Sequence, residues 1–399
     1  MSVVQHHQPS AIAAIKRRQA LFLFFLITGL ALASWVTRTP AIRDQLGVSI
    51  AQMGLILFSI SVGAMSGILS SGHWVRRFGT RPVITTGMLL LLGGLVVLAV
   101  GIALALTMLV TLGLGLFGLG VGLGEIALNI EGAEVERLTQ RPTLSMLHAG
   151  FSFGTFVGGL LGIWLASLAF PVAWHVGLTV LCCFPVTLYG LRAIPAGFAQ
   201  HLQGEHKKPV AKVSMWQDRQ LLFIGLIVLG MALAEGAATD WIPILMVDEH
   251  GFDAALGSML YTGFAGMMAL GRFSGHYFLT RFGRVRVVRA SALLGVIGIG
   301  LVIFASNPWL AAGAVLFWGL GTSLGFPLSI SAASDTGPHP EARVSAVATA
   351  GYVAFLAGPP LLGFVGEHAS LRHALLIVLV LVGTAFFLAR AVEPKGRFK

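Results

Sequence analysis

Two stretches of this chain match each other at a spacing of 204 residues: GILSSGHWVRRFGTR at positions 67–81 and GRFSGHYFLTRFGRV at positions 271–285. Both begin with glycine, and both place Arg-Phe-Gly ten residues later. A second set of glycines repeats at a spacing of 201: Gly118, Gly120 and Gly124 correspond to Gly319, Gly321 and Gly325. Matches in one order at a nearly constant spacing indicate that the two halves of the chain are internal repeats.

The composition is that of a membrane protein. Of the 399 residues, 56% are hydrophobic and only 11% are charged, whereas an ordinary soluble domain has about 25% charged residues. Twelve membrane helices of ~20 residues would use ~240 residues, and the apolar residues with the 51 glycines can supply them. This excludes a soluble enzyme, a disulfide scaffold and a disordered chain, and it disfavours a β-barrel, whose strands alternate. We therefore expect an all-α polytopic membrane protein.

Apolar runs between charges, Pro and Gly clusters predict twelve transmembrane helices. They are expected at 20–37, 51–75, 83–104, 106–130, 143–168, 172–192, 219–241, 255–279, 287–305, 309–333, 343–366 and 371–391. The predicted domains are a six-helix bundle over 19–193, a cytoplasmic linker over 194–217 and a second six-helix bundle over 218–391. Six spans per half give both halves one orientation, so a substrate site is expected between them near the midplane.

The basic residues predict the orientation. With a cytoplasmic N-terminus, 23 of the 26 Lys and Arg residues lie on the cytoplasmic side, and only Arg38, Arg43 and Arg372 lie outside. The alternative is a cleaved signal peptide, because three basic residues at 16–18 precede an apolar stretch and Ala-Leu-Ala at 31–33. Cleavage would place nearly all of this charge outside. We therefore expect a retained first helix and two cytoplasmic termini. The net charge of +10 then comes from basic residues on the cytoplasmic side of the membrane, and no nucleic-acid partner is expected.

Twelve spans, a basic central loop and the paired loops, of which the first reads Gly-His-Trp-Val-Arg-Arg-Phe-Gly-Thr-Arg at 72–81, resemble the major facilitator superfamily. The resemblance covers roughly residues 19–391. It implies the major facilitator fold, a multi-pass protein of the bacterial inner (plasma) membrane, and transport of a small-molecule substrate by a monomer without a cofactor. The family usually has Asp where this chain has Arg76, so the latch that this Asp forms must be built differently here.

A narrower resemblance lies in the fourth predicted helix. Glu-Ile-Ala-Leu-Asn at 125–129 is similar to the Glu-x-Ala-x-Asn stretch of proton-coupled fucose permeases, which implies a role for Glu125 in proton and substrate coupling. Those transporters also use an Asp four residues before a Pro in helix one, where this chain has Val36. A subgroup of bacterial inner-membrane members is similar through Trp35, Arg38 and Pro40 and through Glu235-Gly236-Ala237 with Asp240-Trp241.

Ionisable groups at membrane depth are costly and mark functional pathways by default. Glu125 lies twelve residues before Arg137, or ~18 Å along a helix, which is near the midplane. Asn129 is one turn away on the same face. The two residues predict a protonatable carboxylate beside a substrate-binding amide. The alternative is a protonated Glu that only packs between helices. Glu235, ~24 Å from Arg219, is predicted to be the second proton-coupling carboxylate.

Other side chains are predicted to bind the substrate or to close the gates. His148, Trp35 and Trp241 are candidate substrate contacts, although a lone His more often bonds a backbone group. Arg38 and Asp240 are predicted to pair as a periplasmic gate, or else to be separate interfacial charges. The candidate cytoplasmic gate, or else a set of solvated helix ends, consists of Arg77, Glu134, Arg281 and Asp335.

These residues predict a secondary active transporter that moves a small polar, sugar- or polyol-like solute, with protons as the coupling ion. No Walker loop occurs in the chain, and the apparent nucleophile elbow at 321–325 lies inside an apolar span, so neither an ATPase nor another enzyme is expected. Metal binding is not expected. The 26 Phe residues keep open the alternative of proton-driven efflux of hydrophobic drugs or metabolites. An alternative from another class is a transport-incompetent membrane sensor.

Overall fold

The computed structural model describes residues 11–139, 144–199, 215–337 and 339–393, and all regular structure in these ranges is helical. In the first half the helices are α1 (Ala11–Val36), α2 (Thr39–Leu46), α3 (Ile50–Phe78), α4 (Thr80–Ala103), α5 (Thr107–Thr139), α6 (Leu144–Ser167) and α7 (Val172–Leu191). In the second half they are η1 (Met215–Gln217), α8 (Arg219–Asp248), α9 (Ala254–Phe282), α10 (Arg284–Phe304), α11 (Pro308–Thr322), α12 (Gly325–Asp335), α13 (Pro340–His368), α14 (Leu371–Leu388) and η2 (Ala389–Val392).

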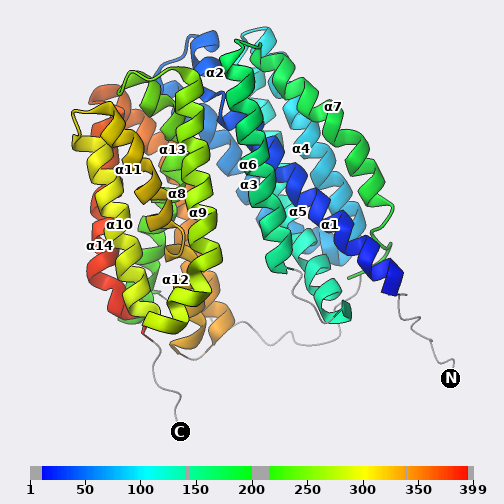
Figure 1. Ribbon diagram of the computed structural model, residues 1–399. Helices are drawn as coiled ribbons and strands as arrows, with labels where there is room; N and C mark the ends of the chain where they lie inside the picture. The colour runs from blue at the N-terminus through cyan, green and yellow to red at the C-terminus, as the bar shows by residue number, and fades with distance from the viewer. Residues whose placement is uncertain (1–10, 140–143, 200–214, 338, 394–399) are drawn as a thin grey trace, which may run out of the picture.

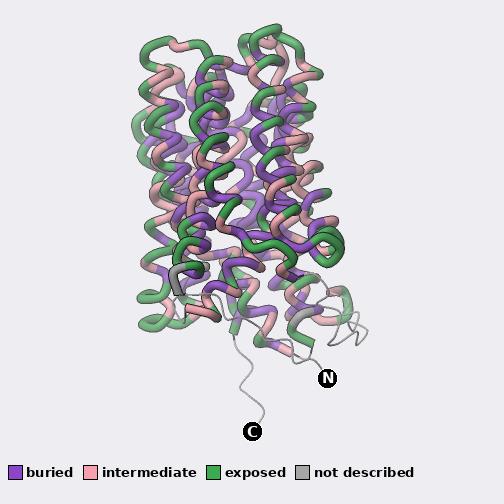
Figure 2. The backbone as a smooth tube through the Cα atoms, turned by 90° about the vertical axis from the view of Figure 1, so that its right-hand side faces the viewer, coloured by how far each residue is buried: buried purple, intermediate pink, exposed green. Residues whose placement is uncertain are grey.

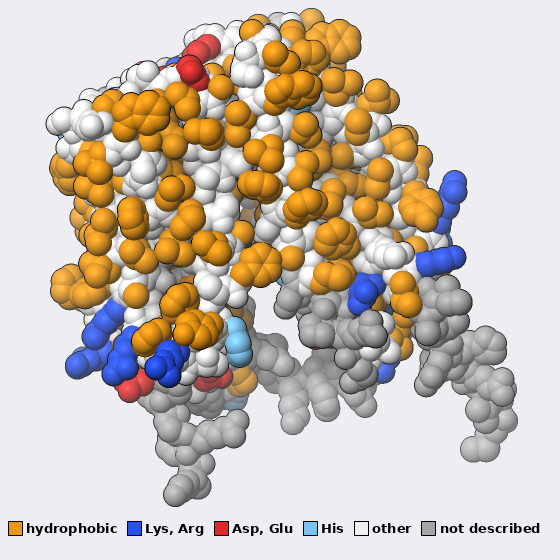
Figure 3. All heavy atoms as spheres, in the orientation of Figure 1, with side chains coloured by type: hydrophobic (Ala, Val, Ile, Leu, Met, Phe, Trp, Pro, Cys, Tyr) orange, Lys and Arg blue, Asp and Glu red, His pale blue; other side chains and the backbone are white. Residues whose placement is uncertain are grey.

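Twelve helical segments in the described residues are long and apolar enough to cross a membrane, which confirms the predicted fold class. Hydrophobic side chains cover the middle of the face in Figure 3, while Lys and Arg gather at the lower end. Buried residues line the inner faces of the helices, and exposed residues face outward (Figure 2). The lower end, where α1 begins, is called the inner end because it is predicted to be cytoplasmic, and the opposite end is called the outer end.

The helices form two groups (Figure 1). In the first, α1 packs on α6 and α7, while α5 packs on α3 and α4; in the second, α8 packs on α13 and α14, while α11 packs on α9 and α10. The linker predicted over 194–217 lies mostly outside the described residues, so the domain boundaries remain a prediction.

Glycines allow the helices within each group to approach closely. A Cβ atom built on Gly118 or Gly122 of α5 would lie 2.1 Å from a backbone carbonyl oxygen of α3. In the second half, a Cβ on Gly319 of α11 would lie 2.5 Å from the Phe264 carbonyl oxygen of α9. Helices in lipid have no hydrophobic driving force for association. Small residues at the crossings let the backbones approach closely, so van der Waals contacts stabilise the helix pair. The repeated glycines therefore position the helices that line the site.

The two halves meet at the outer end, through α3 with α13 and α6 with α9. The Ser61 hydroxyl donates a hydrogen bond of 2.9 Å to the Phe355 carbonyl, and the Ser258 hydroxyl donates to the Thr37 carbonyl. Both contacts join one half to the other. Toward the inner end the two groups of helices diverge (Figure 1), and the space-filling view is hollowed between the halves at this end (Figure 3). The chain is therefore closed at the outer end and open toward the inner end.

Four elements differ from the prediction in ways that matter for the site. The short helix α2 was not expected, because its eight residues are too polar and too few for a span; Pro40 starts it and Gly47, with φ +62°, ends it. The helices α5 and α8 continue past the predicted ends at 130 and 241, because helical hydrogen bonding does not stop where the apolar run stops. The tenth span is interrupted at residues 323–324, between α11 and α12.

Candidate functional site: a charged cavity between the two halves

A cavity of about 440 Å³ lies between the two halves and is lined by α3 and α5 on one side and by α8, α9, α12 and α13 on the other. Its ionisable side chains are Glu125, Glu235, Asp240, Arg272 and Tyr352. The remaining lining residues are Ile60, Ser61, Ala64, Met65, Ile68, Gly236, Thr239, Phe326, Phe355 and Leu356. Charges from both repeats thus meet in the space where a parallel-repeat transporter binds its substrate.

Glu125 is the ionisable group that the first half presents to this cavity. It is exposed to the cavity although it lies in the middle of α5, fourteen residues before the end of that helix at Thr139. The Asn129 amide donates a hydrogen bond of 2.9 Å to the Glu125 backbone carbonyl and does not line the cavity. The structure therefore places Glu125 where it was predicted but turns Asn129 away from a direct substrate contact.

Glu235 and Arg272 form an ion pair of 3.0 Å across α8 and α9. Both side chains line the cavity, and the Arg272 side chain is 40% exposed, so it can move within the open space. Arg272 was not among the predicted site residues, although it lies inside a predicted span and ten residues before the end of α9. The rule that selected Glu125 and Glu235 applies equally to a cation at this depth, and it would have found Arg272.

The predicted gate contact between Arg38 and Asp240 is not formed in this structure. Asp240 lines the central cavity, because α8 continues for eight residues beyond it, or ~12 Å. Arg38 lies past the end of α1, where its guanidinium donates a hydrogen bond of 2.6 Å to the Phe170 carbonyl of its own half. Burial lowers the pKa of Arg38. Placing the end of the seventh span at residue 241 put Asp240 too close to the outer boundary.

His148 lies at a second, smaller cavity of about 170 Å³ inside the first half. Glu125 lines this cavity as well, together with Phe25, whose ring meets the His148 ring edge-on with centroids 5.1 Å apart. Glu125 therefore lies between the side cavity with His148 and the central cavity. His148 does not line the central cavity, so its predicted substrate contact is not seen there.

Trp35 and Trp241 are each 1% exposed and do not line the central cavity. Trp35 packs edge-on against Phe117, and the Trp241 ring lies against Gly363 of α13. Their indole N–H groups have no partner within the described residues. Both residues are therefore part of the packed helix core in this conformation and cannot contact a substrate in it.

The arrangement matches a known protein family. The Major Facilitator Superfamily model matches residues 20–352 and 241–398. This chain belongs to the major facilitator superfamily. Its relatives include an uncharacterized MFS-type transporter of Yersinia pestis, 29% identical over 97% of this chain and 98% of the relative. Another is the membrane protein MosC of Rhizobium meliloti, 26% identical over 89% of this chain and 85% of the relative.

Solved structures share the fold at low sequence identity. A mutant of the nucleoside transporter NupG has a TM-score of 0.76 at 13% identity and covers 94% of this chain and 98% of its own. The fucose:proton symporter FucP in its outward conformation has a TM-score of 0.65 at 17% identity and covers 96% of this chain and all of its own. The chain is thus a multi-pass secondary transporter of a small molecule and not an enzyme. Among the described residues, no group of three His, Cys, Asp or Glu side chains could hold a metal ion.

In this major facilitator protein, a different ion pair joins the halves at the outer end. The Arg43 guanidinium forms hydrogen bonds with Asp248, one of them 3.0 Å long, and it also contacts the neighbouring Asp44. Asp248 raises the pKa of Arg43 because the carboxylate favours the charged guanidinium. Arg43 and Asp248 lie at equivalent ends of the two repeats, so this ion pair joins repeat-related positions.

The predicted cytoplasmic gate residues form contacts within their own halves. Glu134 pairs with Arg137 one turn along α5 at 2.7 Å, and Asp335 pairs with Arg284 at 2.7 Å. The Arg77 guanidinium lies 5.4 Å from the ring centroid of the adjacent Phe78. Arg281 ends α9, where no described residue pairs with it. Because the inner end is open here, a gate between the halves at this end remains a prediction.

Proposed function

We propose that this transporter moves a small polar, sugar- or polyol-like solute together with protons, and that Glu125 is the coupling carboxylate with Glu235 assisting. The observation that supports this most directly is the shared cavity, where Glu125 of one half faces the Glu235–Arg272 pair of the other. A carboxylate that changes its charge at this place alters the cost of closing the halves over the cavity.

The proposed coupling uses the difference between the two carboxylates. Glu235 has Arg272 as a counter-ion, whereas no side chain of the described residues hydrogen-bonds the Glu125 carboxylate. An ionised Glu125 would become an unpaired charge when the inner end closes and water leaves. Protonation removes that charge, so closure of the empty or loaded cavity becomes possible only after a proton binds.

The substrate class follows from the lining. Ser61, Thr239 and Tyr352 supply hydroxyl groups beside the carboxylates, and Phe326 and Phe355 supply aromatic surfaces. Hydroxyl-rich solutes need several donors and acceptors in a small space together with an apolar face for the ring carbons. The second candidate, efflux of hydrophobic compounds, is favoured by the apolar wall that α3 presents through Ile60, Met65 and Ile68.

Substrate screening by thermal stability tests this proposal, because a ligand that binds only the folded state raises the melting temperature. Sugars, polyols, organic acids and lipophilic cations are screened at pH 5.5 and 7.5. We expect a hydroxylated hit whose uptake into proteoliposomes follows an inward proton gradient. Glu125→Gln should reduce gradient-driven uptake by at least about tenfold, since a neutral amide cannot exchange protons.

The matched control is Glu393→Gln, which makes the same change at an exposed carboxylate next to η2, and it should transport normally. Proton-driven uptake that survives in Glu125→Gln would refute the assignment of the coupling group. Hits confined to lipophilic cations would replace the polar-solute proposal with hydrophobic efflux.

A further inference from the structure

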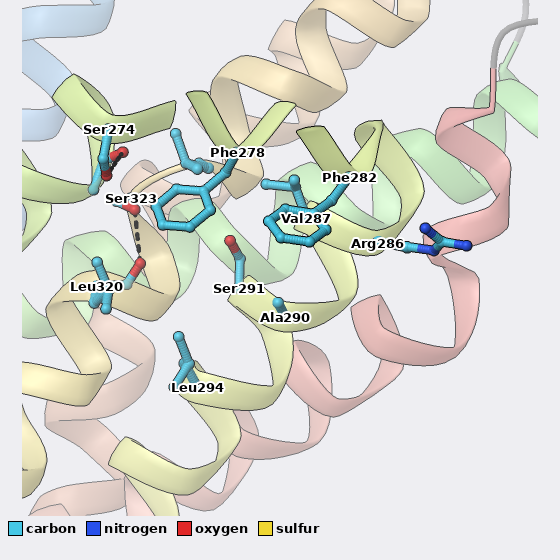
Figure 4. A pocket seen from close by; sticks show the side chains of 12 residues that line it. Ser274, Phe278, Phe282, Arg286, Val287, Ala290, Ser291, Leu294, Leu320 and Ser323 are labelled. Atoms are coloured by element: carbon cyan, nitrogen blue, oxygen red, sulfur yellow. Dashed lines mark hydrogen bonds between the residues drawn. The ribbon is translucent and has the colours of Figure 1, made fainter. Parts of the chain in front are cut away.

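A second concave site lies outside the central cavity, between α9, α10 and the junction of α11 with α12. It is a groove of about 360 Å³ whose lining is almost wholly apolar or small. The lining residues used below are Phe278, Phe282, Arg286, Ala290, Ser291 and Leu294. Figure 4 shows Phe278 and Phe282 along one side, with Ala290, Ser291 and Leu294 following α10 along the other. None of these residues lines the central cavity, so the groove is a separate site.

The groove lies at membrane depth and begins at the inner end. Arg286 is in the first turn of α10, and Leu294 is eight residues further along, or ~12 Å into the span. The rings of Phe278 and Phe282 are exposed, as are Arg286 and Ala290. The groove is therefore a surface feature of a transmembrane region, where the surrounding molecules are lipids.

One polar side chain lies inside the groove without a partner. Ser291 is 5% exposed, and its hydroxyl points into the space between α10 and the aromatic rings (Figure 4). No hydrogen bond to it is formed by the described residues. A hydroxyl that faces an apolar groove without a partner is unfavourable once an acyl chain replaces water there, so an acceptor on the bound molecule would satisfy it.

The charges at the mouth of the groove are positive. Among the residues that line the groove, Arg286 is the charged one, and it forms no ion pair or hydrogen bond with a described residue. The nearby Arg284 is already neutralised by Asp335. In addition, no side chain caps the first N–H groups of α10, so the positive end of the helix dipole faces the same region.

We propose that this groove is a binding site for an anionic phospholipid of the surrounding bilayer, with the phosphate at Arg286 and an acyl chain between the two phenylalanines and α10. Basic pockets between transmembrane helices on the cytoplasmic side suit anionic head groups. Here the Arg286 guanidinium needs a counter-charge, and the groove that continues from it along α10 is lined mostly by apolar side chains that suit an acyl chain. The ester oxygens of the lipid supply the acceptor that Ser291 needs.

The site touches the helix that presents Arg272. Gly271 lines the groove, whereas the next residue, Arg272, lines the central cavity and pairs with Glu235. A lipid in the groove therefore packs against α9 behind the ion pair. The proposal does not rest on the proposed transport function, because lipid binding is measured without any substrate.

Native mass spectrometry of the purified transporter tests the site, with phosphatidylglycerol, phosphatidylcholine or inorganic phosphate added to lipid-depleted protein. We expect one phosphatidylglycerol to be retained at least fivefold better than phosphatidylcholine. Arg286→Gln should abolish this preference, and Ala290→Trp, which fills the groove from its exposed wall, should remove the retained lipid. The matched control is Arg76→Gln, which changes an exposed arginine in the last turn of α3 in the first half and should bind as the original protein does.

Each other outcome overturns the proposal. If Arg286→Gln and Ala290→Trp both keep the phosphatidylglycerol, the lipid binds elsewhere. Retention of phosphatidylcholine equal to that of phosphatidylglycerol would show an apolar groove without head-group recognition. Displacement of the lipid by inorganic phosphate at equal concentration would show a phosphate site rather than a lipid site. Because Arg286 is exposed, its variant keeps the test valid even if Ala290→Trp fails to fold.

Discussion

Single residues show what sequence reasoning could and could not find in this transporter. Glu125 and Glu235 were predicted to lie in the substrate region because a carboxylate at membrane depth needs a reason, and both line the cavity. Arg272 also lies within a predicted span, so the same reasoning applies to it, but the positive-inside rule alone assigns it to the basic residues of the cytoplasmic side. Side-chain direction was out of reach, because Asn129 bonds its own helix backbone while Trp35 and Trp241 are buried.

The ion pair of Glu235 and Arg272 makes a prediction at this scale. Arg272→Gln leaves the Glu235 carboxylate unpaired and should lower the free energy of unfolding by about 1–2 kcal/mol. This is less than the ~3–5 kcal/mol for a fully buried pair, because Arg272 is partly exposed. The double variant Glu235→Gln/Arg272→Gln should recover most of the loss. Thermal unfolding in detergent measures both, and a double variant less stable than Arg272→Gln would contradict the pairing.

At the scale of helices, the apolar pattern predicted all twelve spans found among the described residues, since the bilayer requires about twenty apolar residues in each. It could not predict where helices end outside the bilayer, and this decides function here. Because α8 runs to Asp248, that residue and not Asp240 reaches the outer end. The contacts between the halves were also not predictable. They depend on which glycines contact helices of the other half and which contact helices of their own half.

Gly54 of α3 makes a prediction about one helix contact. A Cβ atom at this position would lie 2.6 Å from the Pro359 carbonyl oxygen of α13, so Gly54→Ala must push the halves apart at the outer end. We expect the variant to favour the state that opens outward. Labelling of Thr239→Cys, in the cavity, by an impermeant thiol reagent from outside should rise at least about threefold in a background lacking Cys182 and Cys183. That factor corresponds to ~0.7 kcal/mol of differential stability.

The control for this experiment is Gly93→Ala in α4, where a Cβ atom meets nothing within 4 Å. It changes the same residue type in a transmembrane helix without touching the other half, so labelling should stay at the original level. Equal labelling of both variants would mean that the contact between α3 and α13 does not control access from outside.

For the whole molecule, alternating access requires that the outer contacts break when the inner end closes. Among the described residues, the outer end is closed by packing, by hydrogen bonds from the Ser258 hydroxyl to the Thr37 carbonyl and from the Ala51 N–H to the Glu367 carboxylate, and by the ion pair of Arg43 with Asp248. The Arg43 and Asp248 side chains are 15% and 24% exposed, so the pair lies between an exposed and a fully buried one and contributes about 1–2 kcal/mol. Such a contribution suits a gate, because a strong pair would hold the transporter in one state.

Charge exchange across the halves therefore gives the final prediction. Arg43→Asp places two carboxylates together at the outer end and should shift the population toward the outward-open state about five- to thirtyfold, which corresponds to the loss of about 1–2 kcal/mol from this partly buried pair. Asp248→Arg should act in the same direction, and Arg43→Asp/Asp248→Arg should restore the original accessibility. The same exchange at Arg38 and Asp240 should restore nothing, because Arg38 bonds the Phe170 carbonyl in its own half. Labelling of Thr239→Cys from the outside by an impermeant thiol reagent distinguishes these variants. If the exchange restores the original labelling at Arg38 and Asp240 but not at Arg43 and Asp248, the gate is the pair predicted from the sequence.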